Sequence, residues 1–206
     1  MIKIKNKVIG ITGNSGSGKS SVCEILRLYK NIFLISADQI AHEIILPGKL
    51  AYDNLIKVFS DKILSDDLIS IDRKKLSNIA FSSSENIKKL NAITHKIIID
   101  EIMYKINRLR LEKNNYDLIV IDAPLLIETG LNKICNEVWL IYSEKKFLFD
   151  RLSQREKISH EQIKIRLDNQ IDFEQAKKFA DIIIYNNGSK LALSEQIKKI
   201  LDTGRG

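Results

Sequence analysis

The segment Gly-Asn-Ser-Gly-Ser-Gly-Lys-Ser at residues 13–20 constrains this chain more than any other feature of the sequence. It fits the pattern Gly-x-x-x-x-Gly-Lys-Ser/Thr and follows an apolar, β-branched run at residues 7–12. Small residues let backbone N–H groups wrap a polyphosphate, and a helix that begins near Lys19 directs its partial positive charge at the same anion. Lys19 can reach the β- and γ-phosphates, and the Ser20 hydroxyl is a ligand for Mg²⁺. The loop therefore predicts a nucleoside triphosphate site.

Short apolar runs alternate with longer helical patterns along the chain. Five runs have the near-continuous apolar character of strands covered on both faces, at residues 7–12, 32–36, 117–122, 137–142 and 181–185. Helical patterns lie at residues 20–29, 86–112, 143–154, 159–170 and 191–201. This alternation predicts an α/β fold, a parallel sheet with helices on both faces.

Two stretches add helices without strands. Residues 37–116 read as nearly all helix, which is too much for a simple crossover, and we expect a helical lobe there. A shorter helical stretch at residues 144–180 precedes the last strand and carries Arg151 and Arg155. Neither stretch is set off by a flexible linker, so both are expected to be excursions from one core.

Charge and cysteine content limit the partners and the compartment. The 206 residues have a formal net charge of +7, but the cations are spread out, with no block of five like charges. A net positive charge favours anionic partners, whether phosphorylated metabolites or nucleic acid, and charge alone does not choose between them. Without a block of like charges a nucleic-acid arm is not indicated, and we expect small-molecule partners and neither nucleic acid nor a membrane. Cys23 and Cys135 are far apart, and no apolar stretch is long enough for a signal peptide or a membrane span. These features predict a cytoplasmic protein.

A glycine loop alone leaves the acceptor of the phosphate open. A GTP-dependent switch needs Asn-Lys-x-Asp, and Asn132-Lys133-Ile134-Cys135 lacks the essential Asp. A helical lobe and an arginine-bearing lid favour a small-molecule kinase, which must exclude water from the transferred phosphate. A nucleoside or nucleotide kinase and, less readily, a nucleotide-dependent switch ATPase remain as alternatives.

Several side chains have both a functional and a structural interpretation. Asp38, just after the second strand run, suits a general base for an acceptor hydroxyl or a helix N-cap. Asp122 ends the third run and suits a Mg²⁺ ligand or a solvated strand end. Arg151 and Arg155 share a helix face and suit a phosphate clamp or surface ion pairs. His95 lies in a long helical pattern, where a lone histidine is more often a core or interface residue than a catalytic one.

Beyond the glycine loop, the sequence contains further elements in a fixed order: Ala37-Asp38, Asp72-Arg73, Pro124-Leu125-Leu126-Ile127-Glu128, Arg151-x-x-x-Arg155, Gln170 and Asn186-Asn187-Gly188. Together with the loop they give the chain, from end to end, a resemblance to the dephospho-coenzyme A kinase family. It implies transfer of the γ-phosphate of ATP, with Mg²⁺, to the 3′-hydroxyl of the ribose of dephospho-CoA. It also implies a P-loop kinase-like core at residues 1–59, 106–143 and 179–206, a helical CoA-substrate domain at 60–105 and a lid at 144–178.

The resemblance also implies roles for individual residues. Asp38 matches the proposed base, and Lys19 and Arg155 are expected to act with it on the phosphates. On the substrate side we expect Asp38 together with Arg73, His95 and Arg151. The residues expected to bind the nucleotide are Asn14, Ser15, Gly16, Ser17, Gly18, Lys19, Ser20, Ser21 and Asn187, with Ser20 as the metal ligand.

Three positions bear on these implied roles. Ser36 stands where the family has Asp, so any role of that carboxylate is absent. Lys96 follows His95 where Pro is usual, which weakens the transfer of a role to His95. The family pattern is variable at Asp122, which argues against an indispensable metal role there. We expect a monomer or weak homo-oligomer with ATP and dephospho-CoA as its small-molecule substrates.

Overall fold

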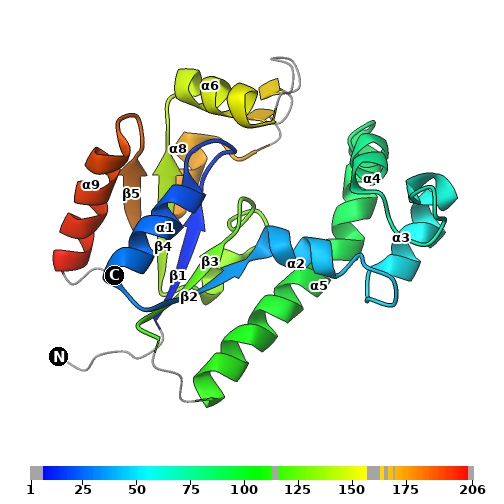
Figure 1. The fold of residues 1–206 in the computed structure, drawn as a ribbon, viewed down its shortest axis with the longest axis horizontal. Coiled ribbons are helices and arrows are strands. Elements are labelled where there is room, and N and C mark those ends of the chain that lie inside the picture. The colour runs from blue at the N-terminus through cyan, green and yellow to red at the C-terminus, as the bar shows by residue number, and fades with distance from the viewer. Residues whose placement is uncertain (1–6, 113–115, 157–162, 165–166, 169, 204–206) are drawn as a thin grey trace. The chain divides into compact units, whose positions relative to one another are not determined.

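The computed structural model describes residues 7–112, 116–156, 163–164, 167–168 and 170–203 (Figure 1). The chain divides into two compact units: unit 1 comprises Met1–Ser36 with Leu109–Gly206, and unit 2 comprises Ala37–Arg108. Unit 2 begins earlier than the CoA-substrate domain predicted at 60–105, which remains a prediction about function, as does the lid at 144–178.

Unit 1 is built on a five-stranded parallel sheet. Its strands are β1 (Lys7–Thr12), β2 (Ile32–Ser36), β3 (Leu118–Asp122), β4 (Glu137–Tyr142) and β5 (Ile182–Tyr185), in the order β2-β3-β1-β4-β5. Runs of Ile, Val and Leu suit strands that are covered on both faces, and β1 and β3 are buried over almost their whole length. All five predicted strands are confirmed to within one residue, as is the predicted α/β class.

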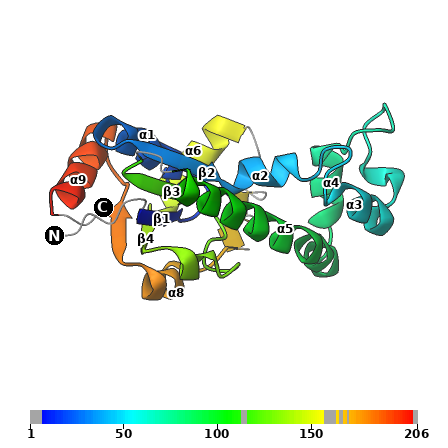
Figure 2. The same cartoon turned by 90° about the horizontal axis from the view of Figure 1, so that it is seen from below.

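Two helices cover one face of this sheet. Helices α1 (Lys19–Tyr29) and α9 (Lys190–Asp202) lie side by side (Figures 1 and 2). Their apolar side chains join Ile9, Ile11 and Trp139 in one buried cluster. Because β1 alternates its side chains between the two faces, its two isoleucines anchor this layer directly behind the glycine loop.

The other face approaches the chain that follows β3. A Cβ added at Gly10 would lie 2.6 Å from Leu126 Cδ2 and 2.7 Å from Cys135 Sγ, so only glycine allows this packing. The segment 124–136 contains the short helix η2 (Leu131–Ile134). Trp139 is fully buried, and its indole N–H donates to Glu137 Oε2 (3.0 Å), which satisfies its polar atom.

Unit 1 also contains the helices between β4 and β5. These are α6 (Lys145–Glu156), α8 (Phe173–Ala176) and η3 (Lys177–Phe179). The helix predicted at 159–170 lies mostly outside the described residues. Among the residues that the structure describes, no helix is both long and apolar enough to cross a membrane.

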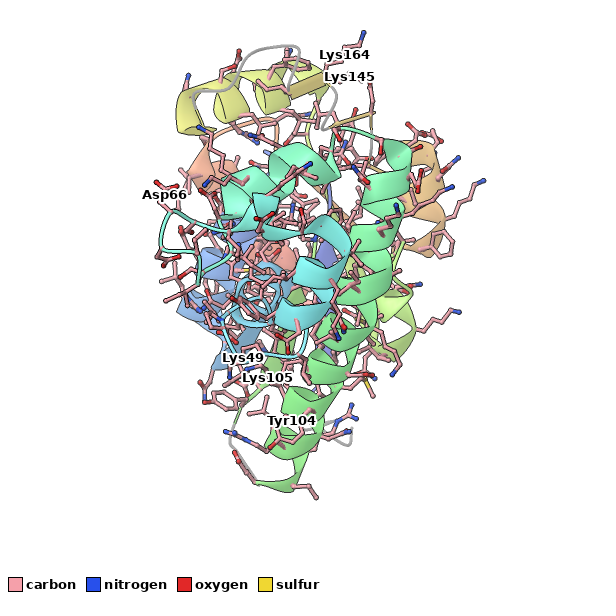
Figure 3. All side chains as sticks on the ribbon, turned by 90° about the vertical axis from the view of Figure 1, so that its right-hand side faces the viewer. Lys49, Asp66, Tyr104, Lys105, Lys145 and Lys164 are labelled. Carbon is pink, nitrogen blue, oxygen red and sulfur yellow. The ribbon has the colours of Figure 1, made fainter. Side chains whose placement is uncertain are left out.

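Unit 2 is nearly all helix, as predicted. Its helices are α2 (Ala37–Glu43), α3 (Tyr52–Phe59), η1 (Asp61–Ile63), α4 (Arg73–Ala80) and α5 (Ser84–Leu111), whose last turn enters unit 1. Asp72 caps α4, because its carboxylate accepts from the N–H groups of Lys74 (2.7 Å) and Lys75 (3.0 Å). The Lys75 ammonium in turn pairs with Asp66 (3.0 Å), whose exposed side chain is labelled in Figure 3.

Candidate active site

The glycine loop connects the carboxyl end of β1 to the first turn of α1, as the sequence predicts. Gly13 and Gly18 have φ angles of 143° and 98°, which favour glycine. A Cβ would lie 2.2 Å from the carbonyl oxygen of Ile141 at Gly13, and 2.1 Å from Asn186 Nδ2 at Gly18. The two glycines are therefore required by close packing as well as by their backbone angles.

The N-terminus of α1 is suited to an anion. Gly18 is its N-cap residue, with no side-chain cap hydrogen bond, and its first turn contains no acidic residue. Helix N-termini present N–H groups and a partial positive charge to a phosphate. Lys19 extends over the loop, where its Nζ donates to the carbonyls of Gly13 (2.8 Å) and Asn14 (3.3 Å). These groups fit a nucleotide polyphosphate.

The residues present also fit Mg²⁺. Ser20, in the first turn of α1, is exposed, and its hydroxyl is a hard oxygen ligand of the kind that Mg²⁺ takes. Within the described ranges, no group of three or more His, Cys, Asp or Glu side chains has the arrangement of a metal site. Mg²⁺ bound to a nucleotide also takes phosphate oxygens and water as ligands, so Ser20 would be one ligand among several.

Asp122 lies at the same edge of the sheet. It is the last residue of β3, in register with Ile11 of β1 and Ser36 of β2. Burial raises the pKa of the Cys23 thiol to about 12, and the negative charge of Asp122 adds to this effect. Asp122 thus lies close enough to α1 for its charge to act there, and a place in the Mg²⁺ shell stays a hypothesis.

The two arginines predicted in the lid lie on the same helix, but only one of them has a described side chain. Arg151 lies on α6, and its guanidinium donates to backbone carbonyls of the glycine loop and of the turn after β5. Arg155 also belongs to α6, but its side chain lies outside the described part of the chain. The structure therefore brings Arg151 to the phosphate loop and leaves the predicted role of Arg155 untested.

Asn187, predicted near the nucleotide base, follows β5 and is hydrogen-bonded to Glu144, just before α6. Its Oδ1 accepts from the N–H of Glu144 (2.9 Å), and its Nδ2 donates to Glu144 Oε1 (3.0 Å). Both ends of its amide are thus engaged by one residue. The contact fixes the turn after β5 against the chain that leads into α6.

Gln170 contacts the phosphate loop directly, a contact that sequence analysis missed. Its Oε1 accepts from the N–H of Ser15 (2.9 Å), and its Nε2 lies 3.4 Å from Ser15 Oγ. The next residue, Ile171, donates its N–H to Glu128 Oε1 (3.2 Å). Both Gln170 and Glu128 belong to the motifs quoted for the resemblance, which was the only signal available, because Ser15 and Gln170 are 155 residues apart.

The candidate acceptor residues lie in unit 2. Asp38 is exposed in the first turn of α2; since the helix already begins at Ala37, the N-cap interpretation is wrong. His42 follows it by four residues, so the two share a helix face. The pKa of His42 is lowered, first by burial and then by the positive charge of Arg73, while Asp38 opposes the shift. The charges of Asp38 and Arg73 therefore both act on His42.

His42 is a residue that sequence analysis did not select, although its spacing from Asp38 was a usable signal. Arg73 is exposed at the start of α4. His95 is half-buried within α5, which continues through Lys96 without interruption, so the usual Pro is replaced by regular helix. A role for His95 on the acceptor side stays a prediction.

Comparisons with known proteins identify the family of this chain. A family model described as dephospho-CoA kinase matches residues 7–192. A curated dephospho-CoA kinase from Carboxydothermus hydrogenoformans is 38% identical over 194 residues, which cover 94% of this chain and 92% of that protein.

Solved structures give the same result. The dephospho-CoA kinase from Campylobacter jejuni has a TM-score of 0.68 at 32% identity, with 96% of each chain covered. A Thermus thermophilus protein has a TM-score of 0.79 at 26% identity and covers 98% of this chain and 100% of its own. The resemblance seen in the sequence is thereby confirmed: the chain belongs to the dephospho-CoA kinase family, whose reaction is the ATP-dependent phosphorylation of dephospho-CoA.

Proposed function

We propose that this chain transfers the γ-phosphate of ATP to the 3′-hydroxyl of the ribose of dephospho-CoA, which gives CoA and ADP. Family membership supports the donor and the acceptor. The observation that carries the proposal is the phosphate loop itself. There, Lys19 extends over a glycine-lined turn at the N-terminus of α1, which has no side-chain cap.

The loop binds and orients ATP. Residues 14–21 supply N–H groups and hydroxyls, and the Lys19 ammonium contacts the β- and γ-phosphates, where negative charge must be neutralised during transfer. Ser20 holds Mg²⁺, which supplies further charge neutralisation on the phosphate oxygens when bound. Asn187 lies on the base side of the nucleotide.

Asp38 serves the acceptor. The ribose oxygen forms a bond to the γ-phosphorus, and the bond from that phosphorus to the β–γ bridging oxygen breaks, so that ADP leaves. The proton of the hydroxyl passes to the Asp38 carboxylate. The exposed position of Asp38, two residues after the end of β2, supports this role because a bulky acceptor needs open access.

The remaining predicted residues complete the proposal. Arg155 neutralises charge on the transferred phosphoryl group as the lid at 144–178 excludes water. Arg73 and His95 bind the acceptor within the domain at 60–105. The protein acts as a monomer or weak homo-oligomer, and its two free cysteines, Cys23 and Cys135, are consistent with the reducing cytoplasm.

A panel of acceptors tests this function. The full chain is assayed with ATP and Mg²⁺ against dephospho-CoA, nucleosides and nucleoside monophosphates, and ADP formation is measured in each case. We expect dephospho-CoA to give the highest kcat/KM and little ATP hydrolysis without an acceptor. Preference for a nucleoside or nucleotide would assign the chain to the alternative kinase class, and hydrolysis without acceptor would favour a switch ATPase.

A further inference from the structure

Three side chains from distant parts of unit 1 hold the outer side of the phosphate loop. They are Arg151 on α6, Ser143 directly after β4 and Asn186 directly after β5, and we call them the carbonyl brace. Ser143 and Asn186 are buried, with 3% and 6% of their surfaces exposed. Arg151 is half-buried beside them. Polar groups at such depth are retained only with hydrogen-bond partners, and here the partners are backbone carbonyls.

Arg151 links the phosphate loop to the turn after β5. Its Nη1 donates to the carbonyl of Gly16 (3.2 Å) and to Ser143 Oγ (3.0 Å), and its Nη2 donates to the carbonyl of Asn186 (2.9 Å). A planar guanidinium makes these bonds in fixed directions, whereas a lysine ammonium has neither the fork nor the reach to replace both.

The other two members bond to the loop and to each other. Asn186 Nδ2 donates to the carbonyl of Ser17 (2.7 Å), and Ser143 Oγ donates to the carbonyl of Asn186 (2.7 Å). Each member of the brace therefore contacts another member, so the loss of one weakens the rest. Asn186 also occupies the space that a side chain at Gly18 would need.

This arrangement determines the direction of loop N–H groups. In a trans peptide the C=O and the following N–H point in opposite directions, and the described residues contain no cis peptide. The bond from Asn186 to the Ser17 carbonyl thus turns the Gly18 N–H toward the opposite side. Phosphate loops bind anions through such N–H groups. The brace therefore holds the loop from the side opposite to the Gly18 N–H.

We propose that Arg151 is a positioning residue for ATP, which acts through the carbonyl brace by holding the Gly16 and Asn186 carbonyls. This differs from the phosphate clamp that its spacing from Arg155 suits, and from the substrate-side role that the sequence analysis expects. The inference rests on the proposed function, because ATP is taken as the ligand whose phosphates the loop receives.

The test compares ATP affinity among Arg151→Met, Arg151→Lys and Ser143→Ala, measured by calorimetry on the full chain and by initial rates. We expect ATP binding to weaken about tenfold in both Arg151 variants and about threefold in Ser143→Ala. The KM for dephospho-CoA is expected to stay unchanged. The matched control is Lys145→Met, which removes a cation from the exposed first turn of α6 (Figure 3) and is expected to bind ATP normally.

The double variant Arg151→Met/Ser143→Ala separates the brace from independent effects. We expect its loss of ATP affinity to be smaller than the product of the two single losses, since both changes dismantle one network. Additive losses, normal affinity in Ser143→Ala, or rescue by Arg151→Lys would overturn the inference. A lower kcat at unchanged KM and unchanged calorimetric affinity for ATP would also overturn it, because the effect would then lie outside ATP binding.

The calorimetric readout keeps this inference separate from the proposed function. A wild-type chain that binds ATP but phosphorylates another acceptor contradicts the assignment of dephospho-CoA and leaves the brace to be judged on ATP affinity alone. If all three variants phosphorylate dephospho-CoA normally and bind ATP with normal affinity, the inference about Arg151 is wrong and the proposed function still stands.

Discussion

The phosphate loop and the candidate acceptor residues differ in how the fold holds them. In unit 1, Ser15 and Ser17 are buried, and the loop is fixed through backbone groups by Gln170 and by the carbonyl brace. In unit 2, Asp38 and Arg73 are exposed side chains at the starts of short helices. A site made of backbone groups changes only when the packing around it changes. An exposed side chain, in contrast, can be removed with the fold intact.

The strongest test of this difference between the two regions is a substitution of Asp38. Asp38→Asn keeps the size and polarity of the side chain but removes the carboxylate, and we expect kcat to fall by about 10²–10⁴. Because Asp38 is exposed, the melting temperature and the KM for ATP should stay close to those of the wild type. Asp53→Asn, which changes another exposed acid in the first turn of α3, is the control. Equal activity of the two variants would remove Asp38 from its role as base.

Lys19 tests the nucleotide side. Lys19→Met removes the ammonium that bonds to Gly13 and Asn14, and we expect kcat/KM for ATP to fall by about 10²–10³. Initial rates at varied ATP measure the effect, with Lys145→Met as the control for loss of one cation. If the only effect were a higher KM for dephospho-CoA, the role of Lys19 in binding ATP would be contradicted.

Arg73 gives a smaller expected effect, confined to the acceptor. Dephospho-CoA carries a diphosphate, and loss of one charge-assisted contact in Arg73→Gln should raise its KM about tenfold without changing the KM for ATP. Lys74→Gln, at the next exposed position of α4, is the control. In the same variant, NMR titration should show a higher pKa of His42, because the positive charge that helps to lower it is gone.

The smallest effect concerns the stability of unit 2. Bonds from the N–H groups of Lys75 and Lys74 hold the pKa of Asp72 below its ordinary value. The charged cap therefore stabilises the fold above the ordinary aspartate pKa of about 3.9, and this contribution is lost as the pH falls through the lower, folded-state pKa. Asp72→Ala should melt slightly below the wild type at pH 7, and the difference should narrow under acid conditions.

Thermal unfolding followed by circular dichroism between about pH 7 and pH 2 measures that difference. Asp66→Ala removes a carboxylate that pairs with the same Lys75, but that carboxylate caps no helix, and it serves as the control. A gap between Asp72→Ala and the wild type that stays constant over this range would show that the carboxylate charge contributes nothing to the cap.

Much of the fold could be predicted, because the sequence patterns that indicate strands and helices are local. Each strand is an apolar run bounded by polar or turn residues, and all five were located to within one residue. Helix ends were less accurate: the long helix was expected from residue 86 and begins at Ser84, where Ser83 precedes it and its Oγ accepts the N–H of Asn86. Such terminal hydrogen bonds depend on single polar side chains and carry little periodic signal.

The site was predictable where it is continuous in sequence. The loop at residues 13–20 was located completely, because glycine spacing reports directly on backbone shape. Gln170 and Ser143 were not selected, because their partners in the loop lie more than 100 residues away. Only the tertiary fold creates those contacts. His42 is a different case. Its spacing from Asp38 is visible in the sequence, but the burial and the charged neighbours that shift its pKa appear only in the structure.

The most direct test of the central claim is to follow the phosphate itself. The wild-type chain is incubated with γ-labelled ATP, Mg²⁺ and dephospho-CoA, and the labelled product is located by mass spectrometry and ³¹P NMR. The account predicts that the label appears as a phosphomonoester on the ribose 3′-oxygen of CoA, with one ADP formed for each CoA. Label in inorganic phosphate, or on any other oxygen of the acceptor, would contradict it.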